Sequence, residues 1–168
     1  YMRDIALDGD ETRYFCYCDF DNFKPFNDHY GFHLGDHAIS LFAALLRRYF
    51  FSDGDFLGHV GGDDFFIGVS DWSREELTEI LDRLLSDFHD DVIELYSEND
   101  RHAGRIKGVD RHGQERDFAL MRCSIGVLEL PRGRVIDDVS RISAEIADLK
   151  KSAKDSDTGL ALGTFGAA

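Results

Sequence analysis

Apolar and polar residues alternate along the chain in patterns that predict both strands and helices. A dense apolar and aromatic run over Thr12–Phe20 is typical of a central strand that is buried on both faces. Apolar residues recur at helical spacing over Leu34–Phe51 and over about Arg74–Asp90, which predicts two amphipathic helices. Ser73, followed three residues later by Glu76, predicts a capping box at the start of the second helix.

A β-hairpin is predicted between these two helices. Two short apolar runs flank Gly61 and Gly62, a pair that readily adopts the positive φ of a tight turn. Asp63 and Asp64 follow directly, so two like charges stand side by side, which is costly unless a cation shares them. Turn chemistry alone also selects glycine and aspartate. By itself, this stretch is therefore consistent with a metal site or with a polar turn.

The second half of the chain is less regular. Tyr96–Glu115 is polar, mixed in charge and interrupted by glycines, which predicts a long excursion with a β-hairpin around Asp110–Gly113. Phe118–Leu130 returns to strand character, and a third helix is expected over about Asp137–Ala153. Thr158–Ala168 is small and weakly apolar, and no element is predicted there.

The order of these elements, with a hairpin between two helices, favours an α+β fold over a doubly wound parallel sheet. We expect a ferredoxin-like or polymerase-palm-like mixed sheet, flanked by helices, with the hairpin turn at the active site. A length of 168 residues without a repeat or a Pro- or Ser-rich linker indicates one domain over residues 1–168. Because the chain begins at Tyr1, we expect it to be a piece of a longer protein.

The acidic composition argues against several classes of partner. The net charge is −14, from 19 Lys+Arg and 33 Asp+Glu, so no broad cationic surface is available for nucleic acid or an anionic membrane. A phosphorylated ligand would need a metal bridge. The odd number of cysteines, Cys16, Cys18 and Cys123, indicates buried free thiols. No signal peptide is visible and no apolar run approaches the roughly 18 residues of a membrane span, so we expect a cytoplasmic location.

Acidic residues occur at two places that such a sheet can bring together. Asp19 and Asp21 close the first predicted strand, and the hairpin tip carries Asp63 and Asp64. If the strand end and the tip lie side by side, several carboxylates meet at one edge. Mg²⁺ prefers such oxygen ligands and usually completes its coordination with substrate phosphates. The pattern therefore favours phosphoryl chemistry on a nucleotide.

The same residues carry a family resemblance. Asp19–Asp36, His59–Phe65 and Ser124–Val127 occur in the order of the motifs of the GGDEF domain, and the resemblance extends over about Tyr14–Lys154. The chain thus resembles the diguanylate cyclase family. This resemblance implies condensation of two GTP into cyclic di-GMP in bacterial second-messenger signalling. It also implies a homodimer in which each of two antiparallel subunits holds one GTP, within a multidomain signalling protein.

The resemblance assigns metal and catalytic roles to the acidic residues. Asp19 and Asp63 match metal ligands, and the carbonyl of Phe20 matches a third donor, for Mg²⁺ or Mn²⁺. Asp64 stands where the family has its signature glutamate, beside the metal and the reacting 3′-hydroxyl. One of Asp63 and Asp64 is then expected to act as the general base.

The resemblance also assigns substrate contacts. Asn27 and Asp36 resemble the pair that reads guanine, since an amide and a carboxylate suit its O6 and N1–H/N2–H edge. Each also has an ordinary structural alternative, because Asn27 suits a helix cap and Asp36 suits the first turn of a helix. The remaining expected contacts are to the phosphates and their surroundings, from Gly61, Gly62, Phe23 and Lys24, and from Lys150, Lys151 or Lys154.

Departures from the family pattern leave two functions open. Asp64 is one methylene shorter than glutamate, which withdraws the carboxylate by roughly 1.5 Å, and a misplacement near 1 Å can cost about a hundredfold in rate. Ser52 replaces the arginine of the product-inhibition motif Arg-x-x-Asp, so no inhibitory site is expected. The chain is either an active cyclase or a catalytically impaired GTP-binding domain that regulates an adjacent EAL phosphodiesterase, since it resembles GGDEF domains found with one. A palm domain acting on nucleic acid is disfavoured by the net charge.

Overall fold

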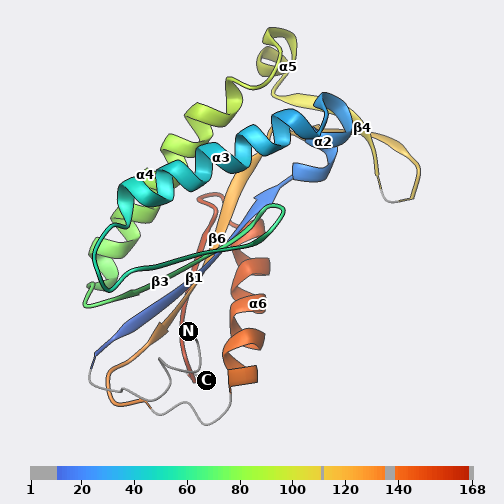
Figure 1. Ribbon diagram of the computed structural model, residues 1–168. Coiled ribbons are helices and arrows are strands. Elements are labelled where there is room, and N and C mark those ends of the chain that lie inside the picture. Colours follow the sequence, from blue (N-terminus) through green and yellow to red (C-terminus); the bar gives the residue numbers. More distant parts are fainter. Residues whose placement is uncertain (1–10, 111, 135–138, 167–168) are drawn as a thin grey trace.

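The protein folds around one mixed β-sheet with helices on both faces. The computed structural model describes residues 11–110, 112–134 and 139–166 (Figure 1). In chain order, its elements are β1 (Arg13–Asp21), α2 (Phe23–Tyr30), α3 (Phe32–Tyr49), β2 (Phe56–Gly61), β3 (Asp64–Ser70), α4 (Arg74–Ile93), α5 (Glu98–Ala103), β4 (Arg105–Val109), β5 (Glu115–Ala119), β6 (Arg122–Leu130), α6 (Val139–Asp155) and β7 (Leu160–Thr164). The expected α+β class is confirmed.

The predicted first strand lies at the centre of the sheet. The strand order is β2-β3-β1-β6-β7, and β1 is antiparallel to both of its neighbours, whereas β6 and β7 are parallel. Strands β4 and β5 form a separate two-stranded sheet that projects beyond α2 (Figure 1). The end of β1 and the β2–β3 turn therefore meet at one edge of the main sheet.

Side chains of β1 alternate between two apolar layers. Its even-numbered residues pack against α3 and α4, whereas Phe15 and Tyr17 belong to the layer under α6. Phe20 ends the even series in an aromatic cluster with rings from α3, β3 and α4. Asp19 and Asp21 continue the odd series, so the strand pattern alone directs their carboxylates to the α6 side.

Helix α6 lies unusually close to the sheet at Gly126 of β6. A Cβ placed there would lie 2.6 Å from the backbone nitrogen of Lys150 and 2.9 Å from the carbonyl carbon of Leu149. Any side chain at this position would push the helix outward. The glycine at position 126 therefore allows α6 to pack close to the sheet, which lets the Lys150 side chain contact the carboxylates at the sheet edge.

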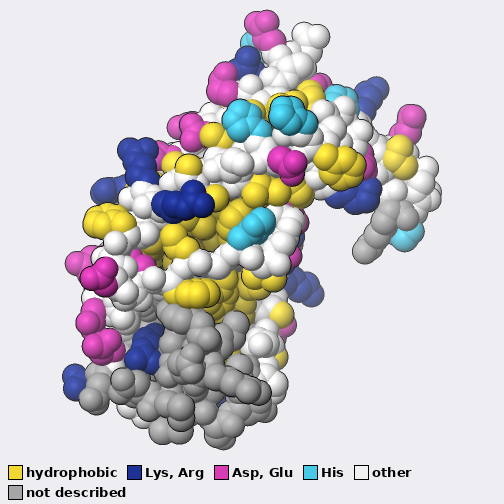
Figure 2. All heavy atoms as spheres, in the orientation of Figure 1, with side chains coloured by type: hydrophobic (Ala, Val, Ile, Leu, Met, Phe, Trp, Pro, Cys, Tyr) yellow, Lys and Arg dark blue, Asp and Glu magenta, His cyan; other side chains and the backbone are white. Residues whose placement is uncertain are grey.

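The layer formed by α3 and α4 does not fully cover the outer strand β2. Between α3 and β2 lies a small cavity lined by Leu46, Arg47, Leu57, His59 and Phe65, and Figure 2 shows apolar side chains gathered in this part of the surface. Leu57 is accordingly only partly buried. In the part of the chain that the structure describes, no helix has both the length and the apolar character needed to cross a membrane.

Most of the predicted local elements are confirmed. The hairpin forms, the capping box joins Ser73 and Glu76 in both directions, and the three cysteines are free and buried. Helices α3 and α4 differ from their predicted ranges by two or three residues at their ends. The expected hairpin in the polar excursion is β4–β5, with its turn at Asp110–Gln114.

One strand start was predicted wrongly, and two elements were missed. Phe118 belongs to β5, so the strand expected to start there begins only at Arg122. The short helix α5 was not predicted, and neither was β7, whose weakly apolar residues form a strand because the edge of β6 offers them backbone partners. The expected start of the third helix, at Asp137, lies outside the described residues.

Candidate active site

The acidic residues of the two sequence motifs meet at the edge of the sheet. The last registered pair of β1 and β3 is Cys18 with Phe65, and one further step of the antiparallel ladder places Asp19 opposite Asp64. Asp19 is only 7% exposed. Asp63 precedes Asp64 in the hairpin turn, where Gly61 and Gly62 have φ values of 143° and 58°. The structure thus brings together the residues that the sequence placed apart.

Two lysines of α6 lie on these carboxylates. Lys150 Nζ lies 2.6 Å from Asp19 Oδ2 and 2.9 Å from Asp64 Oδ1, and it also sits 4.5 Å from the ring centroid of Tyr17. Lys154 pairs with Asp19 Oδ1, and its Nζ lies 3.6 Å from Asp21 Oδ1. Residues four apart share one face of a helix. Lys151, the other lysine expected to reach phosphates, is exposed one residue further round the helix.

The adjacent carboxyls of Asp63 and Asp64 have opposite electrostatic environments. Burial raises the pKa of Asp64, but hydrogen bonds with Lys150 and Asp19 together with the charge of Lys150 outweigh it and lower that pKa. Burial also raises the pKa of Asp63, and the charges of Asp19 and Asp64 raise it further. For Lys150, burial lowers the pKa, yet its two carboxylate partners raise it overall.

The donor chemistry of this edge suits a hard cation. Carboxylate oxygens of Asp19, Asp63 and Asp64 are the ligand type that Mg²⁺ and Mn²⁺ prefer. Asp19 Oδ1 is buried and accepts no hydrogen bond from the described residues, although the Lys154 ammonium lies beside it. Among residues 11–110, 112–134 and 139–166, no three acidic, histidine or cysteine side chains already surround one point as a metal site. Lysine ammonium groups balance the acidic charge instead.

An open cavity of about 490 Å³ lies beside Asp63, between the first turn of α2 and the β4–β5 hairpin. Phe20, Phe23 and Lys24 line it, together with Asp63. Asn22 precedes α2 with a φ of 62° and places no side chain over the helix end, because its amide nitrogen donates to the carbonyl of Ala119 at 3.1 Å. Lys24 pairs with Asp28 at 2.5 Å and is exposed.

The predicted guanine contacts lie on α2 and α3. Asn27 lies inside α2 and Asp36 lies beyond the first turn of α3, so neither has the ordinary capping role that was the alternative. Asn27 Oδ1 is buried and has no hydrogen-bond partner among the described residues. A Cβ at Gly35 would lie 1.9 Å from this oxygen, so the glycine makes room for the Asn27 side chain.

Two features of the site were missed from the sequence. Gly35 stands inside a helix, where glycine costs about 1 kcal/mol relative to alanine, and that local cost was a signal of its role. Asp21 received no role, although it accepts hydrogen bonds from Arg122 Nε at 2.9 Å and Ser124 Oγ at 2.6 Å. Arg122 and Ser124 come from β6, which pattern alone could not place beside the end of β1.

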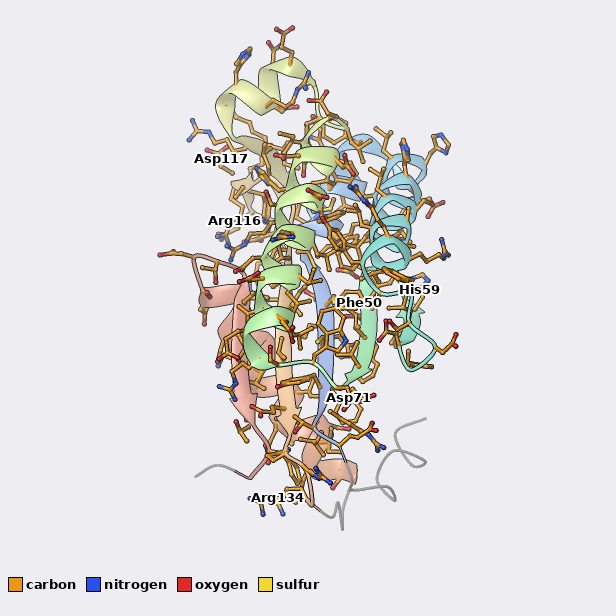
Figure 3. All side chains as sticks on the ribbon, turned by 90° about the vertical axis from the view of Figure 1, so that its left-hand side faces the viewer. Phe50, His59, Asp71, Arg116, Asp117 and Arg134 are labelled. Carbon is orange, nitrogen blue, oxygen red and sulfur yellow. The ribbon has the colours of Figure 1, made fainter. Side chains whose placement is uncertain are left out.

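The hairpin turn and the expected inhibitory position are also defined. His59 stacks on Phe65 with ring centroids 4.5 Å apart, and its Nε2 lies 2.9 Å from the carbonyl oxygen of Gly62, which steadies the turn. Figure 3 shows His59 on this hairpin. Ser52 is exposed and its backbone nitrogen donates to Asp55 Oδ2 at 2.9 Å.

Comparison with known proteins agrees with this geometry. The sequence model described as "Diguanylate cyclase, GGDEF domain" matches residues 4–104. The chain therefore belongs to the GGDEF family of diguanylate cyclase domains. A search of curated proteins finds no significant match.

Solved GGDEF domains share the fold at low sequence identity. The GGDEF domain of DgcB from Caulobacter crescentus, solved in complex with c-di-GMP, is 18% identical with a TM-score of 0.64, over 99% of this chain and 85% of that one. The GGDEF domain of PA1120 from Pseudomonas aeruginosa is 18% identical with a TM-score of 0.63, over 99% and 89%. The active GGEEF domain of a Vibrio cholerae diguanylate cyclase is 19% identical with a TM-score of 0.61, over 94% and 85%.

Proposed function

We propose that this domain binds GTP with Mg²⁺ or Mn²⁺ and, as a homodimer, condenses two GTP into cyclic di-GMP. The observation that carries the proposal is the meeting of Asp19 and Asp64 with Lys150 and Lys154 beside the cavity at the start of α2. Carboxylates suit the metal ion of a nucleoside triphosphate, and the neighbouring ammonium groups suit its phosphates.

The metal site is proposed from the carboxylates at the edge of the sheet. Asp19, Asp63 and the carbonyl of Phe20 would hold the cation, with Asp64 beside them. When bound, it would act as a Lewis acid on the phosphates and balance their charge. Lys150 and Lys154 would then exchange their carboxylate partners for phosphate oxygens, which they can reach from the face of α6 that already covers the site.

One of the adjacent carboxylates Asp63 and Asp64 would accept the proton of the attacking 3′-hydroxyl, as general base. Lys150, which lies 2.9 Å from Asp64 Oδ1, would balance the charge of this acidic pair.

Guanine specificity is proposed for Asn27 and Asp36. The buried Asn27 Oδ1 has unused acceptor capacity, and guanine offers N1–H and N2–H donors that adenine lacks. A buried acceptor left unpaired by the wrong base costs binding free energy, so the same atom would reject ATP.

A second candidate function is a catalytically impaired GTP-binding domain that regulates an adjacent EAL phosphodiesterase. The observation that favours it is the state of Asp64, which is shorter than the family glutamate and is held by Lys150 at 2.9 Å. A carboxylate held back in this way is less available to the metal and to the 3′-hydroxyl.

The test is incubation of the purified domain with GTP and Mg²⁺ at high protein concentration, since an excised domain can dimerise weakly. Cyclic di-GMP is followed by chromatography and GTP binding by calorimetry. The cyclase predicts product that disappears in Asp63→Ala. The regulatory domain predicts GTP binding without product, even in a dimerising fusion, and a gain of product in Asp64→Glu. A chain that neither binds GTP nor forms product contradicts both.

A further inference from the structure

The cavity beside Asp63 has a second wall to which no role has yet been given. The β4–β5 hairpin supplies this wall through Asp110, Arg116 and Phe118, opposite the first turn of α2. Its volume of about 490 Å³ lies within the range of small-molecule sites, roughly 300–1,000 Å³. Whatever binds at α2 and Asp63 therefore also meets the hairpin.

The register of the hairpin decides which side chains face this cavity. Arg116 is paired with Gly108, and Phe118 with Ile106, so these residues share one face of the two-stranded sheet. This face packs toward α2, because a Cβ at Gly108 would lie 3.1 Å from the Phe118 ring and 3.9 Å from Pro25. The neighbouring residue Asp117, labelled with Arg116 in Figure 3, belongs to the opposite face.

Arg116 is oriented but not tied down. Its guanidinium lies 5.5 Å from the ring centroid of Phe118 and 3.6 Å from the Asp110 carboxylate, and the side chain is 61% exposed. Asp110 also accepts the backbone N–H groups of His112 and Gln114, at 2.8 and 3.0 Å. Asp110 therefore stays satisfied if Arg116 turns to another anion.

We propose that Arg116 is a substrate-binding residue through which the hairpin holds the phosphates of the nucleoside triphosphate. A guanidinium presents parallel N–H donors that match phosphate oxygens. The cavity lining contains the acids Asp63 and Asp110 and two cations, Lys24 and Arg116. Lys24 is already paired with Asp28 at 2.5 Å, and Lys150 and Lys154 lie on the α6 side, so Arg116 is the cation that the hairpin offers to a polyanion. The inference rests on the proposed binding of GTP.

The chain offers a matched control on the other face of the hairpin. Arg105 is 62% exposed and lies 3.5 Å from its partner Asp117, so it resembles Arg116 in exposure and pairing but lies outside the cavity lining. Binding of a non-hydrolysable GTP analogue with Mg²⁺ is measured by calorimetry in the full chain and in Arg116→Ala, Arg116→Lys and Arg105→Ala. Equal thermal unfolding midpoints verify that each variant is folded.

Arg116→Ala is expected to raise the Kd for the GTP analogue by about tenfold, the loss of one charge-assisted contact, and to change the Kd for GMP much less. Arg116→Lys recovers part of the loss, and Arg105→Ala stays within about twofold of the parent, as surface changes usually do. Equal Kd values for Arg116→Ala and Arg105→Ala overturn the inference while the proposed function stands. An equal loss for GMP and the GTP analogue also overturns it, since Arg116 would then only support the hairpin. A parent chain that binds no triphosphate overturns both.

Discussion

The two halves of the acidic edge differ although they are built from neighbouring residues. The inner half, consisting of Asp19, Asp64, Lys150 and Lys154, lies under α6 and is closed by ion pairs. The outer half, consisting of Asp63, the first turn of α2 and the β4–β5 hairpin, surrounds an open cavity. The pKa of Asp64 is lowered, whereas that of Asp63 is raised.

This difference teaches that one peptide step can change the environment of a carboxylate. Asp64 is the first residue of β3, so the ladder fixes it opposite Asp19 on the α6 face. Asp63 lies in the turn before the ladder starts and is free of that constraint. The inner half is therefore a preformed network of ion pairs, whereas the outer half lines a cavity that is open to a ligand.

The largest expected effect breaks the inner half by moving α6. Gly126→Ala places a Cβ 2.6 Å from the Lys150 backbone nitrogen, so the helix must shift and its lysines must leave the carboxylates. We expect the free energy of unfolding to fall by about 2–3 kcal/mol, as for overpacked cores. Urea unfolding measures it. Gly163→Ala is the control, because its Cβ would meet only the flexible Leu149 side chain, and an equal loss in both variants would contradict this account.

The next largest effect is expected at Asn27, further along α2, whose first turn belongs to the outer half. Gly35→Ala displaces Asn27 Oδ1, which lies 1.9 Å from the new Cβ. We expect the Kd for GTP to rise about tenfold and the preference for GTP over ATP to shrink, because an oriented acceptor is lost. Stability should stay the same or rise by about 0.5–1 kcal/mol, since alanine favours a helix interior. Calorimetry with both nucleotides measures the change, and an unchanged GTP to ATP ratio would argue against Asn27 as the guanine contact.

A smaller effect tests whether Lys150 occupies the place of a cation in the inner half. Lys150→Met keeps a long side chain over Tyr17 but leaves Asp19 and Asp64 facing each other without the ammonium. We expect a loss of about 1 kcal/mol of stability, because Lys154 stays beside the buried Asp19 and Asp64 is partly exposed to solvent. Added Mg²⁺ should restore more stability to this variant than to the parent. Thermal unfolding measures both, with exposed Lys151→Met as the control, and equal Mg²⁺ responses in all three proteins would count against a cation site.

The smallest effect compares the two neighbouring carboxyls directly. Asp64 has a folded-state pKa below its ordinary value of 3.8, so its stabilisation is present above that value and is lost as pH falls through the folded-state pKa. Asp63 has a raised pKa, so its charge reduces stability once pH exceeds that pKa. At pH 7, Asp64→Asn should therefore destabilise and Asp63→Asn should stabilise, each by less than about 1 kcal/mol. Unfolding curves at pH 7 and about pH 2.5 measure this. The changes in unfolding free energy caused by the two substitutions should become similar at the lower pH. Equal changes at pH 7 would contradict the opposite pKa shifts of Asp63 and Asp64.

Local pattern predicted most of the fold because its causes are local. The dense apolar run of β1, the helical stripes of α3 and α4, the capping box at Ser73 and the glycine turn of the hairpin each depend on neighbouring residues. The weakly apolar β7 was missed because its pairing with β6 supplies most of its stability. Phe118 was placed in the wrong strand because its apolar character is the same in β5 as in β6.

The same distinction applies to the site. By itself the sequence predicted which residues would carry the chemistry, namely the acids at the end of β1 and in the hairpin, and Asn27 and Asp36, because motif spacing and turn chemistry are properties of the chain. Only the tertiary structure decided their partners. Lys150 and Lys154, rather than Lys151, lie on the carboxylates. Gly35 leaves room for the Asn27 side chain, and Arg116 lines the cavity beside Asp63. These are contacts between segments far apart in the chain, set by sheet register and by the distance at which α6 packs, and no local pattern encodes them.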